Sequence, residues 1–320
     1  MRIPRIAVVG SYATGLTMKV KRLPASGETV LASGYRVDYG GKGSNQAVGC
    51  ARLGAEVAFV ARIGKDTFGE MALRLYREEG INTAFVQQTA KHPTGVGFIL
   101  VEAGSGNNCI ALDPGANELL SPEDVASCDP ALESADVLLT QLEIRVSTAE
   151  AALSRARERG KMTILNPAPV RPLPASVLQL ADVLTPNETE AKVLTGRSPD
   201  AAVDAEEVAH DLIRSGVRWV VMTLGENGAL IVTASSSRHV PAMRMSAVDT
   251  TGAGDAFNAG LATALASGES LESAVEIAVV IGGLAVTKEG VIPSLPKREE
   301  VVQFHRQRSL KVPDWLLVGN

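Results

Sequence analysis

Short runs of β-branched and other apolar residues alternate along the chain with longer segments of helical periodicity. The runs cover residues 6–10, 58–64, 136–143, 163–169, 182–187 and 219–225. Within segment 66–79, apolar residues recur at the spacing of one helix face: Phe68, Met71, Ala72, Leu75 and Tyr76. This alternation predicts βαβ units, and therefore an α/β fold in which a mostly parallel sheet is covered by helices on both faces.

Two segments break this rhythm. Residues 12–39 and 94–112 are strand-like and rich in glycine, and they lack helical periodicity. We expect them to form a small antiparallel β-sheet that serves as a lid. The main α/β domain then comprises residues 1–11, 40–93 and 113–320, with 12–39 and 94–112 as the lid.

Composition and charge exclude several classes of function. The 320 residues are 45% hydrophobic with a net charge of −5, which indicates a globular protein and gives no basic face for nucleic acid. Three cysteines without Cys-x-x-Cys spacing favour neither a disulfide framework nor a zinc site, so we expect a cytoplasmic protein. The apolar stretch 274–286 contains Glu276 and falls short of the roughly 20 residues that span a bilayer, so no membrane partner is expected.

Each predicted strand ends in a polar or glycine-containing turn. These turns hold Gly64, Glu143, Asn166, Asn187 and Gly225. In open α/β sheets ligands bind beyond the carboxyl ends of the strands, so we expect these turns to meet at one crevice.

The stretch "VDTTGAGDAFNAG" (248–260) is the first candidate site. Gly252, Ala253 and Gly254 precede a helical run whose first turn holds Asp255. Free N–H groups at such a helix start bind phosphate or a developing oxyanion, and an ionised Asp255 there could take a proton from an attacking hydroxyl. The alternative is a plain glycine turn before a helix with an acidic first turn.

The stretch "YGGKGSNQAVGCARLG" (39–54) is the second. It fails the Walker pattern, because Gly43 follows Lys42 and Arg36 stands where the first glycine belongs. A glycine loop that carries Lys42 and Asn45 suits a polyhydroxylated ligand. A tight strand-to-helix turn is the alternative.

The stretch "NETE" (187–190) is the third. Asn187 and Glu190 lie on one helix face near its start, where they could organise hydrated Mg²⁺ and nucleotide phosphates. A capping box formed by the same two residues is the alternative.

Taken together, the three stretches resemble the ribokinase-like carbohydrate kinases, a superfamily that includes ribokinases, fructokinases and adenosine kinases. The likeness runs from Ile6 to about Val301 and is closest to the ribokinase branch. It rests on "GGKGSNQA", "LTQLE", "LNPAP", "TPNETE", "TLGENG" and "AVDTTGAGDAF". The resemblance implies a three-layer α/β/α sandwich with a mostly parallel central sheet and a small β lid. It also implies transfer of the γ-phosphoryl group of ATP to a primary hydroxyl of a small sugar.

The resemblance also implies roles for individual residues. Asp255 would be the catalytic base, beside an anion hole formed by Gly252, Ala253 and Gly254. The sugar would be held by Gly41, Lys42, Asn45, Glu143 and Asp255. The side that binds ATP and Mg²⁺ would comprise Asn187, Glu190 (which would hold Mg²⁺ through water), Thr223, Gly225, Gly228 and Gly254, with adenine near Val279. A K⁺ or other monovalent-cation site would involve Asp249, Thr251, Lys288, Gly290 and Ser294.

The sugar-binding segment departs from the family pattern. Ala13 and Gly15 stand where ribokinases carry an Asn and a sugar-gripping Asp, and residues 6–27 contain no acid. Loss of a hydrogen bond to a charged group costs about 1.5–3 kcal/mol, enough to change the preferred substrate. We therefore expect ribose or another pentose, a deoxy or branched sugar, or a polyol as acceptor, with Thr14, Thr17 or Lys19 offering contacts.

Two other functions remain open at this point. One is a nucleoside kinase, and the other is a sugar-binding regulator that has lost turnover. By analogy with related ribokinases, a homodimer formed through the lid is also expected.

Overall fold

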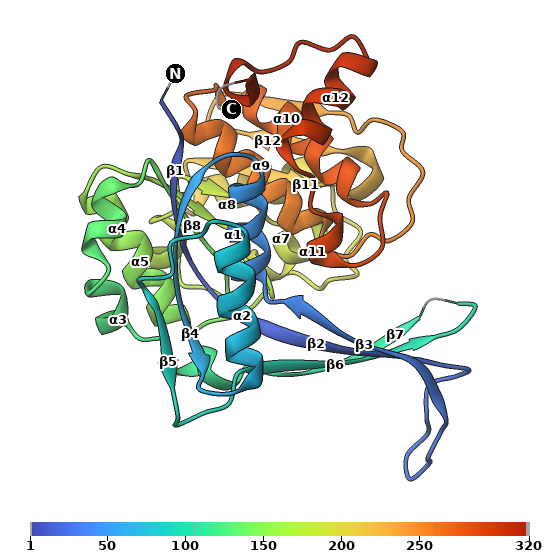
Figure 1. The fold of residues 1–320 in the computed structure, drawn as a ribbon. Coiled ribbons are helices and arrows are strands. Elements are labelled where there is room, and N and C mark those ends of the chain that lie inside the picture. The colour runs from blue at the N-terminus through green and yellow to red at the C-terminus, as the bar shows by residue number, and fades with distance from the viewer. Residues whose placement is uncertain (1, 106, 318–320) are drawn as a thin grey trace.

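A nine-stranded sheet forms the centre of the molecule in the computed structural model, which describes residues 2–105 and 107–317 (Figure 1). The strand order is β13-β12-β11-β10-β9-β8-β1-β4-β5, and all neighbours from β11 to β5 run parallel. The strands are β1 (Arg5–Val9), β4 (Glu56–Gly64), β5 (Val86–Thr89), β8 (Val137–Thr140), β9 (Met162–Leu165), β10 (Val183–Leu184), β11 (Trp219–Thr223), β12 (Ala229–Val232) and β13 (Ser237–Val240).

Helices cover both faces of this sheet. One face holds α1 (Lys42–Arg52), α2 (Thr67–Glu78), α9 (Ala253–Ala266), α10 (Leu271–Ala285), α11 (Val291–Ser294) and α12 (Arg298–Gln307). The other holds α3 (Pro122–Ala126), α4 (Asp129–Ser134), α5 (Val146–Glu158), α6 (Ala175–Leu178), α7 (Glu188–Leu194) and α8 (Ala205–Arg214). Three short 3₁₀ turns complete the described elements: η1 (Gly115–Leu119), η2 (Gly225–Asn227) and η3 (Asp314–Leu317).

Successive side chains of β1 project alternately into the two hydrophobic cores, one on each face of the sheet. Ile6 and Val8 pack in the core beneath α1 and α9, whereas Ala7 and Val9 pack in the core beneath α5. A central strand that is buried on both faces must be apolar at every position, which explains the continuous run in the sequence. The fold is therefore the three-layer α/β/α sandwich that the sequence predicts.

All six strands predicted from the sequence are present, but five end earlier than expected, three of them by three or more residues. The runs 136–143, 163–169 and 182–187 leave the sheet after Thr140, Leu165 and Leu184. Their polar ends lie in loops beyond the sheet. Strands β5, β12 and β13 were not predicted, and β12 and β13 pair antiparallel at one edge.

The predicted helix 66–79 is α2, which begins after Asp66. The Asp66 side chain caps the helix by accepting a hydrogen bond from the backbone N–H of Gly69. The apolar stretch 274–286 lies mostly in α10, whose apolar residues are buried in the core. In the described ranges, 2–105 and 107–317, we find no helix with the length and hydropathy to cross a membrane.

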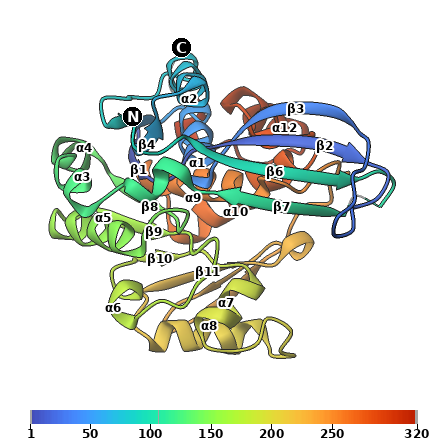
Figure 2. The same cartoon turned by 90° about the horizontal axis from the view of Figure 1, so that it is seen from below.

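A second sheet of four strands projects from the main body (Figures 1 and 2). We call it the small sheet. It has the order β3-β2-β6-β7 and comprises β2 (Ala13–Val20), β3 (Ala32–Gly40), β6 (Gly95–Glu102) and β7 (Asn108–Asp113). The expectation of an antiparallel sheet is wrong for its central pair, because β2 and β6 are parallel. Both strands leave the carboxyl-terminal edge of the main sheet and therefore run outward in the same direction.

Hydrogen bonds fix the base of the small sheet. The Asn117 side chain accepts from the Tyr12 N–H (3.0 Å) and donates to the Tyr12 carbonyl (2.8 Å) where β2 begins. Before β6, Asp66 accepts from the backbone N–H (2.8 Å) and the hydroxyl (2.7 Å) of Thr94. The two central strands are therefore anchored to the main body independently.

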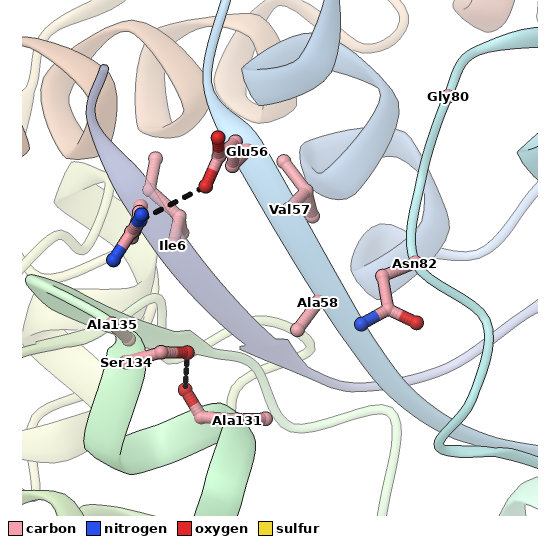
Figure 3. A pocket seen from close by; sticks show the side chains of 10 residues that line it. Ile6, Glu56, Val57, Ala58, Gly80, Asn82, Ala131, Ser134 and Ala135 are labelled. Carbon is pink, nitrogen blue, oxygen red and sulfur yellow. Dashed lines mark hydrogen bonds and ion pairs between the residues drawn. The ribbon is translucent and has the colours of Figure 1, made fainter.

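The opposite edge of the main sheet carries a surface pocket (Figure 3). Arg5 and Glu56 form an ion pair of 2.9 Å in it, and Ile6, Val57 and Ala58 contribute to its lining. These residues lie at the amino-terminal ends of β1 and β4. Ligands of open α/β sheets bind at the carboxyl-terminal edge, so this pocket lies away from the expected site.

Replacement of Asn117 by alanine tests the anchor of β2. The variant Asn117→Ala leaves the buried N–H and carbonyl of Tyr12 without their partner, and we expect the free energy of unfolding to fall by about 2–5 kcal/mol. Chemical denaturation measures the loss. The control is Gln303→Ala, an exposed amide on α12, whose effect should stay within about 0.5 kcal/mol. A loss of that small size for Asn117→Ala would contradict the anchoring role.

Candidate active site

Asp255 is a buried carboxylate in the first turn of α9, where its side chain is 6% exposed. Two side-chain amides of α1 hold it. Asn45 Nδ2 donates to Asp255 Oδ2 at 2.8 Å, and Gln46 Nε2 donates to Asp255 Oδ1 at 2.9 Å. Asp255 is therefore oriented by residues more than 200 positions away in the chain.

A chain of amides continues from this carboxylate across the carboxyl ends of the strands. Gln46 Nε2 also donates to Asn166 Oδ1 (3.0 Å), and Gln46 Oε1 accepts from Gln141 (2.5 Å). Asn166 in turn donates to the carbonyl of Thr185 (3.1 Å). Of the loops predicted to converge, this network joins those that follow β8, β9 and β10, whereas the Gly64 N–H donates to the Thr94 hydroxyl (2.9 Å) at the base of the small sheet.

The same hydrogen-bond network extends to the start of α9. The Thr185 hydroxyl donates to Asn258 Oδ1 (2.6 Å), and Asn258 Nδ2 donates to the carbonyl of Gly254 (2.8 Å). Gln46, Gln141 and Asn258 were not singled out from the sequence. Each lies inside or directly after a stretch that was, which is the signal that could have found them.

The start of α9 has the geometry of an anion site. Its N-cap, Gly252, is left-handed (φ 84°) and has no side-chain cap. A Cβ at Gly252 would lie 2.7 Å from Cγ1 of Val291, so only glycine fits there, whereas a Cβ at Gly254 would meet open space. The first N–H groups of an α-helix lack partners within the helix, and the positive end of the helix dipole lies there. The Ala253 N–H donates to the carbonyl of Thr250 (3.3 Å) in the turn before α9.

Lys42 and Glu143 lie on the other side of Asp255. Glu143 Oε2 accepts from the backbone N–H of Lys42 (2.8 Å) and from the hydroxyl of Ser11 (2.6 Å). The Asp255 carboxylate, with Glu143 and Glu190, raises the pKa of Lys42 against the effect of burial. The loop turns sharply at Gly41 (φ 88°), where a Cβ would lie 2.7 Å from the backbone of Tyr12. Lys42 therefore carries a positive charge close to three carboxylates.

Asn187 and Glu190 form the capping box that was the alternative explanation for this motif. Asn187 Oδ1 accepts from the Glu190 N–H (2.8 Å), and Glu190 Oε2 accepts from the Asn187 N–H (2.9 Å). Burial raises the pKa of Glu190, an effect that Asn187 and Lys42 oppose and Asp255 reinforces. The same carboxylate thus caps α7 and lies within the electrostatic reach of Lys42 and Asp255.

The other residues expected on the nucleotide side spread over β11, its turn and α10. Thr223, the last residue of β11, forms an isolated parallel β-bridge with Asn187. Gly225 begins η2, and Gly228 (φ 95°) packs against the carbonyl of Val240, which gives Gly228 a structural reason to be glycine. Val279 lies on α10 and is 9% exposed.

Four of the five residues expected at the cation site lie on two loops that Asp249 joins, and the fifth, Ser294, is the last residue of α11. Asp249 accepts from the N–H groups of Thr251 (2.9 Å) and Gly290 (3.0 Å). Burial alone would raise the pKa of Asp249, but Thr251, Gly290 and the charge of Arg36 lower it below its usual value. The Lys288 ammonium pairs with Glu300, and the Ser294 hydroxyl donates to the carbonyl of Val291. Each Asp249 oxygen accepts one N–H, and a carboxylate is the kind of oxygen donor that suits a hard cation.

No group of three or more His, Cys, Asp or Glu side chains that could hold a metal ion occurs within residues 2–105 and 107–317. A Mg²⁺ ion at Glu190 would therefore need oxygen ligands from a nucleotide and water, which is the usual arrangement for this ion.

Comparison with known proteins agrees with this geometry. The chain matches the pfkB family of carbohydrate kinases over residues 4–298. It belongs to that family. It is therefore a sugar kinase, a phosphotransferase with an alcohol group as acceptor. A ribokinase of Haemophilus influenzae is 39% identical, with 93% of this chain and 97% of that protein aligned. A deoxyribokinase of Salmonella typhi is 36% identical over 93% of this chain and 98% of the relative.

Solved structures show the same fold. A ribokinase from Thermotoga maritima superposes with a TM-score of 0.86 at 34% identity, covering 95% of this chain and all of that one. A ribokinase from Arabidopsis thaliana, solved with ribose and ATP, gives 0.87 at 30% identity, covering 94% of this chain and 98% of that one. The resemblance read from the sequence is confirmed.

Replacement of Gly252 tests the turn that shapes the anion site. In Gly252→Ala, the left-handed φ and the contact with Val291 should cost about 1–3 kcal/mol of stability and shift the helix start, so kcat should fall at least tenfold. Thermal denaturation and steady-state kinetics measure both.

The matched control is Gly268→Ala at the other end of α9. Gly268 has the same left-handed φ (89°), but a Cβ there meets nothing within 4 Å. This variant should lose stability while kcat and KM stay at wild-type values. Equal kinetic losses in the two variants would show that general strain, and not the anion site, sets the rate.

Proposed function

We propose that this sugar kinase transfers the γ-phosphoryl group of ATP to a primary hydroxyl of a small sugar, ribose or another pentose or polyol, with Asp255 as general base. The proposal rests on one observation. A buried carboxylate, held by two amides of α1, lies at the uncapped start of α9 beside open space at Gly254.

The reaction follows from this arrangement. Asp255 takes the proton of the primary hydroxyl as its oxygen attacks the γ-phosphorus atom, and the bond from that phosphorus to the β-phosphate oxygen breaks to release ADP. The backbone amides of Gly252, Ala253 and Gly254 stabilise the charge on the transferred group. Lys42 adds a positive charge on the side of the acceptor.

The acceptor occupies the space bounded by Gly41, Lys42, Asn45, Glu143 and Asp255. Asn45 offers a specific contact, because its Oδ1 atom is buried and has no hydrogen-bond partner within the described part of the chain. An unpaired buried acceptor is costly, and a sugar hydroxyl would satisfy it. The curated relatives include both a ribokinase and a deoxyribokinase, which supports a pentose as acceptor.

ATP lies on the side of Asn187, Glu190, Thr223, Gly225 and Gly228, with its adenine near Val279 and its phosphates toward Gly254. Glu190 would hold Mg²⁺ through water, and the ion would neutralise charge on the phosphates. The charges of Lys42 and Asp255 both influence the pKa of Glu190, and the charges of Asp255 and Glu190 both influence the pKa of Lys42. This mutual influence supports the placement, because it puts the expected Mg²⁺ ligand near the proposed base and the acceptor side.

A potassium ion binds at Asp249, Thr251, Lys288, Gly290 and Ser294. Its charge would order the two loops that flank Gly252. The lowered pKa of Asp249 keeps that carboxylate ionised at neutral pH, as a cation ligand must be.

The small sheet, with its connections (residues 12–39 and 94–112), is a lid that closes over the acceptor and excludes water, while the rest of the chain forms the nucleotide- and substrate-binding domain. Two copies pair through this lid. Support comes from its large exposed apolar side chains, which include Tyr35, Phe98 and Ile110. The free thiols, among them the exposed Cys109, support a cytoplasmic location.

Replacement of Asp255 tests the proposed base. Asp255→Ala should lower kcat by about 10²- to 10⁴-fold, because the acceptor hydroxyl loses its base, while ATP binding is retained. Coupled ADP release over a panel of pentoses, polyols and nucleosides measures turnover, and calorimetry measures ATP binding. Glu272→Ala, in the first turn of α10, is the control and should have no effect.

Near-normal turnover in Asp255→Ala would contradict the assignment of the base. Sugar-dependent stabilisation of the wild type without any ADP release would favour a regulator, and a preference for nucleosides would favour a nucleoside kinase. The intact Asp255 network argues against a regulator.

Asp249→Asn tests the cation site. In the wild type, K⁺ should raise kcat several-fold over a buffer that contains only bulky organic cations, because the ion orders the loops beside Gly252. Asp249→Asn should remove this dependence and leave kcat near the K⁺-free value. Titration of K⁺ against initial rate measures both. Full K⁺ activation in the variant would place the cation elsewhere.

A further inference from the structure

One face of the small sheet is defined by the register of its strands. Opposite residues in paired strands project to the same face. On one face, two rows of paired residues cross β3, β2 and β6 in that order. The first row is Asp38, Gly15 and Gly97, and the second is Arg36, Thr17 and Ile99. We call the face that carries these rows the inner face.

The inner face is directed toward the loops beside α9. Arg36 Nη1 lies 2.8 Å from Oε1 of Glu289, the neighbour of Gly290, whose N–H donates to Asp249. The positive charge of Arg36 is also one of the causes that lower the pKa of Asp249. Since side chains two apart on a strand share a face, Asp38 projects to the same side as Arg36.

Asp38 is surrounded by open space on this face. Its cross-strand neighbour Gly15 lacks a side chain, as does Gly97 beyond it on β6, and a Cβ added at Gly15 would lie an ordinary 3.8 Å from the Cβ of Asp38. The carboxylate has two long contacts, from the Thr17 hydroxyl (3.5 Å) and from Arg36 Nε (3.6 Å). Its side chain is 39% exposed. A carboxylate has about four lone-pair positions, so most of its accepting capacity is free.

We infer that Asp38 is a specificity-determining residue that accepts hydrogen bonds from two neighbouring hydroxyls of the acceptor. The inference rests on the proposed function. It assigns to the acceptor a pair of adjacent hydroxyl groups, in addition to the primary hydroxyl that reacts at Asp255.

The chain connects Asp38 directly to the reacting groups. Strand β3 ends at Gly40 and leads through Gly41 into α1, which carries Lys42 and Asn45. A sugar whose primary hydroxyl meets Asp255 therefore extends from α1 toward the strand that precedes it. Residues 6–27 supply no acid to this region, so Asp38 provides the charge from the opposite strand.

Two neighbours position the Asp38 carboxylate. Arg36 links it to Glu289, and Thr17 donates to it from β2. Charge-assisted hydrogen bonds to a carboxylate are stronger than neutral ones and depend on direction. A carboxylate that projects from one strand, with these two long contacts on one of its oxygens, discriminates between sugars by the orientation of their hydroxyls.

Kinetics of Asp38→Asn test the inference with the pentose or pentitol that gives the wild type its highest kcat/KM. The acceptor KM should rise about 10- to 100-fold, since a charged acceptor of two hydrogen bonds becomes a neutral amide. The KM for ATP should stay within twofold, because the proposed nucleotide side lies on α7, β11, η2 and α10 and not on the small sheet. An acceptor KM within twofold of wild type would overturn the inference.

Deoxy analogues of the same acceptor separate direct contact from a structural role. Each analogue lacks one hydroxyl. If Asp38 contacts the acceptor, the analogues that lack either contacted hydroxyl should respond less to Asp38→Asn than the parent sugar does. Equal loss with every analogue would show that Asp38 acts only on the structure of the sheet, and would overturn the inference.

Glu102→Gln is the matched control. Glu102 is a carboxylate of the same sheet, but its register partner Val20 lies on the opposite face. This variant should keep the wild-type acceptor KM. The same rise in KM as in Asp38→Asn would mean that the net charge of the lid, and not a contact at Asp38, matters.

A relocation variant completes the test. The double variant Asp38→Ala with Gly15→Asp removes the carboxylate from β3 and places one on β2, on the same inner face. A Cβ at Gly15 has only ordinary contacts. This variant should recover at least about fivefold of the lost kcat/KM for one of the panel sugars. No recovery with any panel sugar would count against a carboxylate contact at this place. Failure of the proposed function is distinct, because the wild type would then show no turnover with any sugar.

Discussion

Two hydrogen bonds from α1 to the Asp255 carboxylate are the constraint on which this site depends. A buried carboxylate is costly unless donors replace its water, so the donors Asn45 and Gln46 must be held close to α9. Close packing of the two helices provides this. A Cβ at Gly49 would lie 2.6 Å from the Cβ of Ala259, so a bare residue at that position lets α1 approach α9. The chemistry at Asp255 thus relies on small residues one to two turns away from it.

The pattern of apolar residues predicts the main sheet well, because central parallel strands are buried on both faces and are apolar throughout. Strand β10 has only two residues in the sheet, but it is still visible in the sequence because its apolar residues are followed by the loop 185–187, which ends at Asn187, the N-cap of α7. The edge strands β12 and β13 were missed because nothing in their composition separates them from a helix–loop pattern. Gly228 lies in the turn between β11 and β12, and residues 233–236 form the turn between β12 and β13, where the Thr233 N–H donates to the Ser236 carbonyl (2.8 Å).

The candidate site was predictable only in part. Glycines and acids such as Gly252 and Asp255 are conspicuous in a helix start, and the family resemblance gave them roles. The neutral amides Gln46 and Gln141 are not conspicuous, since their function lies in a hydrogen bond that joins residues 95 positions apart. Such partners are set by tertiary contacts, and only the structure pairs them.

The small sheet and the start of α9 are constrained in different ways. The helix start depends on backbone geometry at Gly252, whereas the inner face consists of side chains on strands whose register decides which residues lie together. Opposite residues on paired strands have Cβ atoms about 4.5–5.5 Å apart, so a carboxylate at Asp38 reaches the same space as one at Gly15 would, from a different direction. The direction decides which hydroxyls it meets. A sugar that does not satisfy the polar groups of its site leaves them unpaired, which is costly. A carboxylate that projects from β3 instead of β2 can therefore alter which sugar is preferred without any change at Asp255.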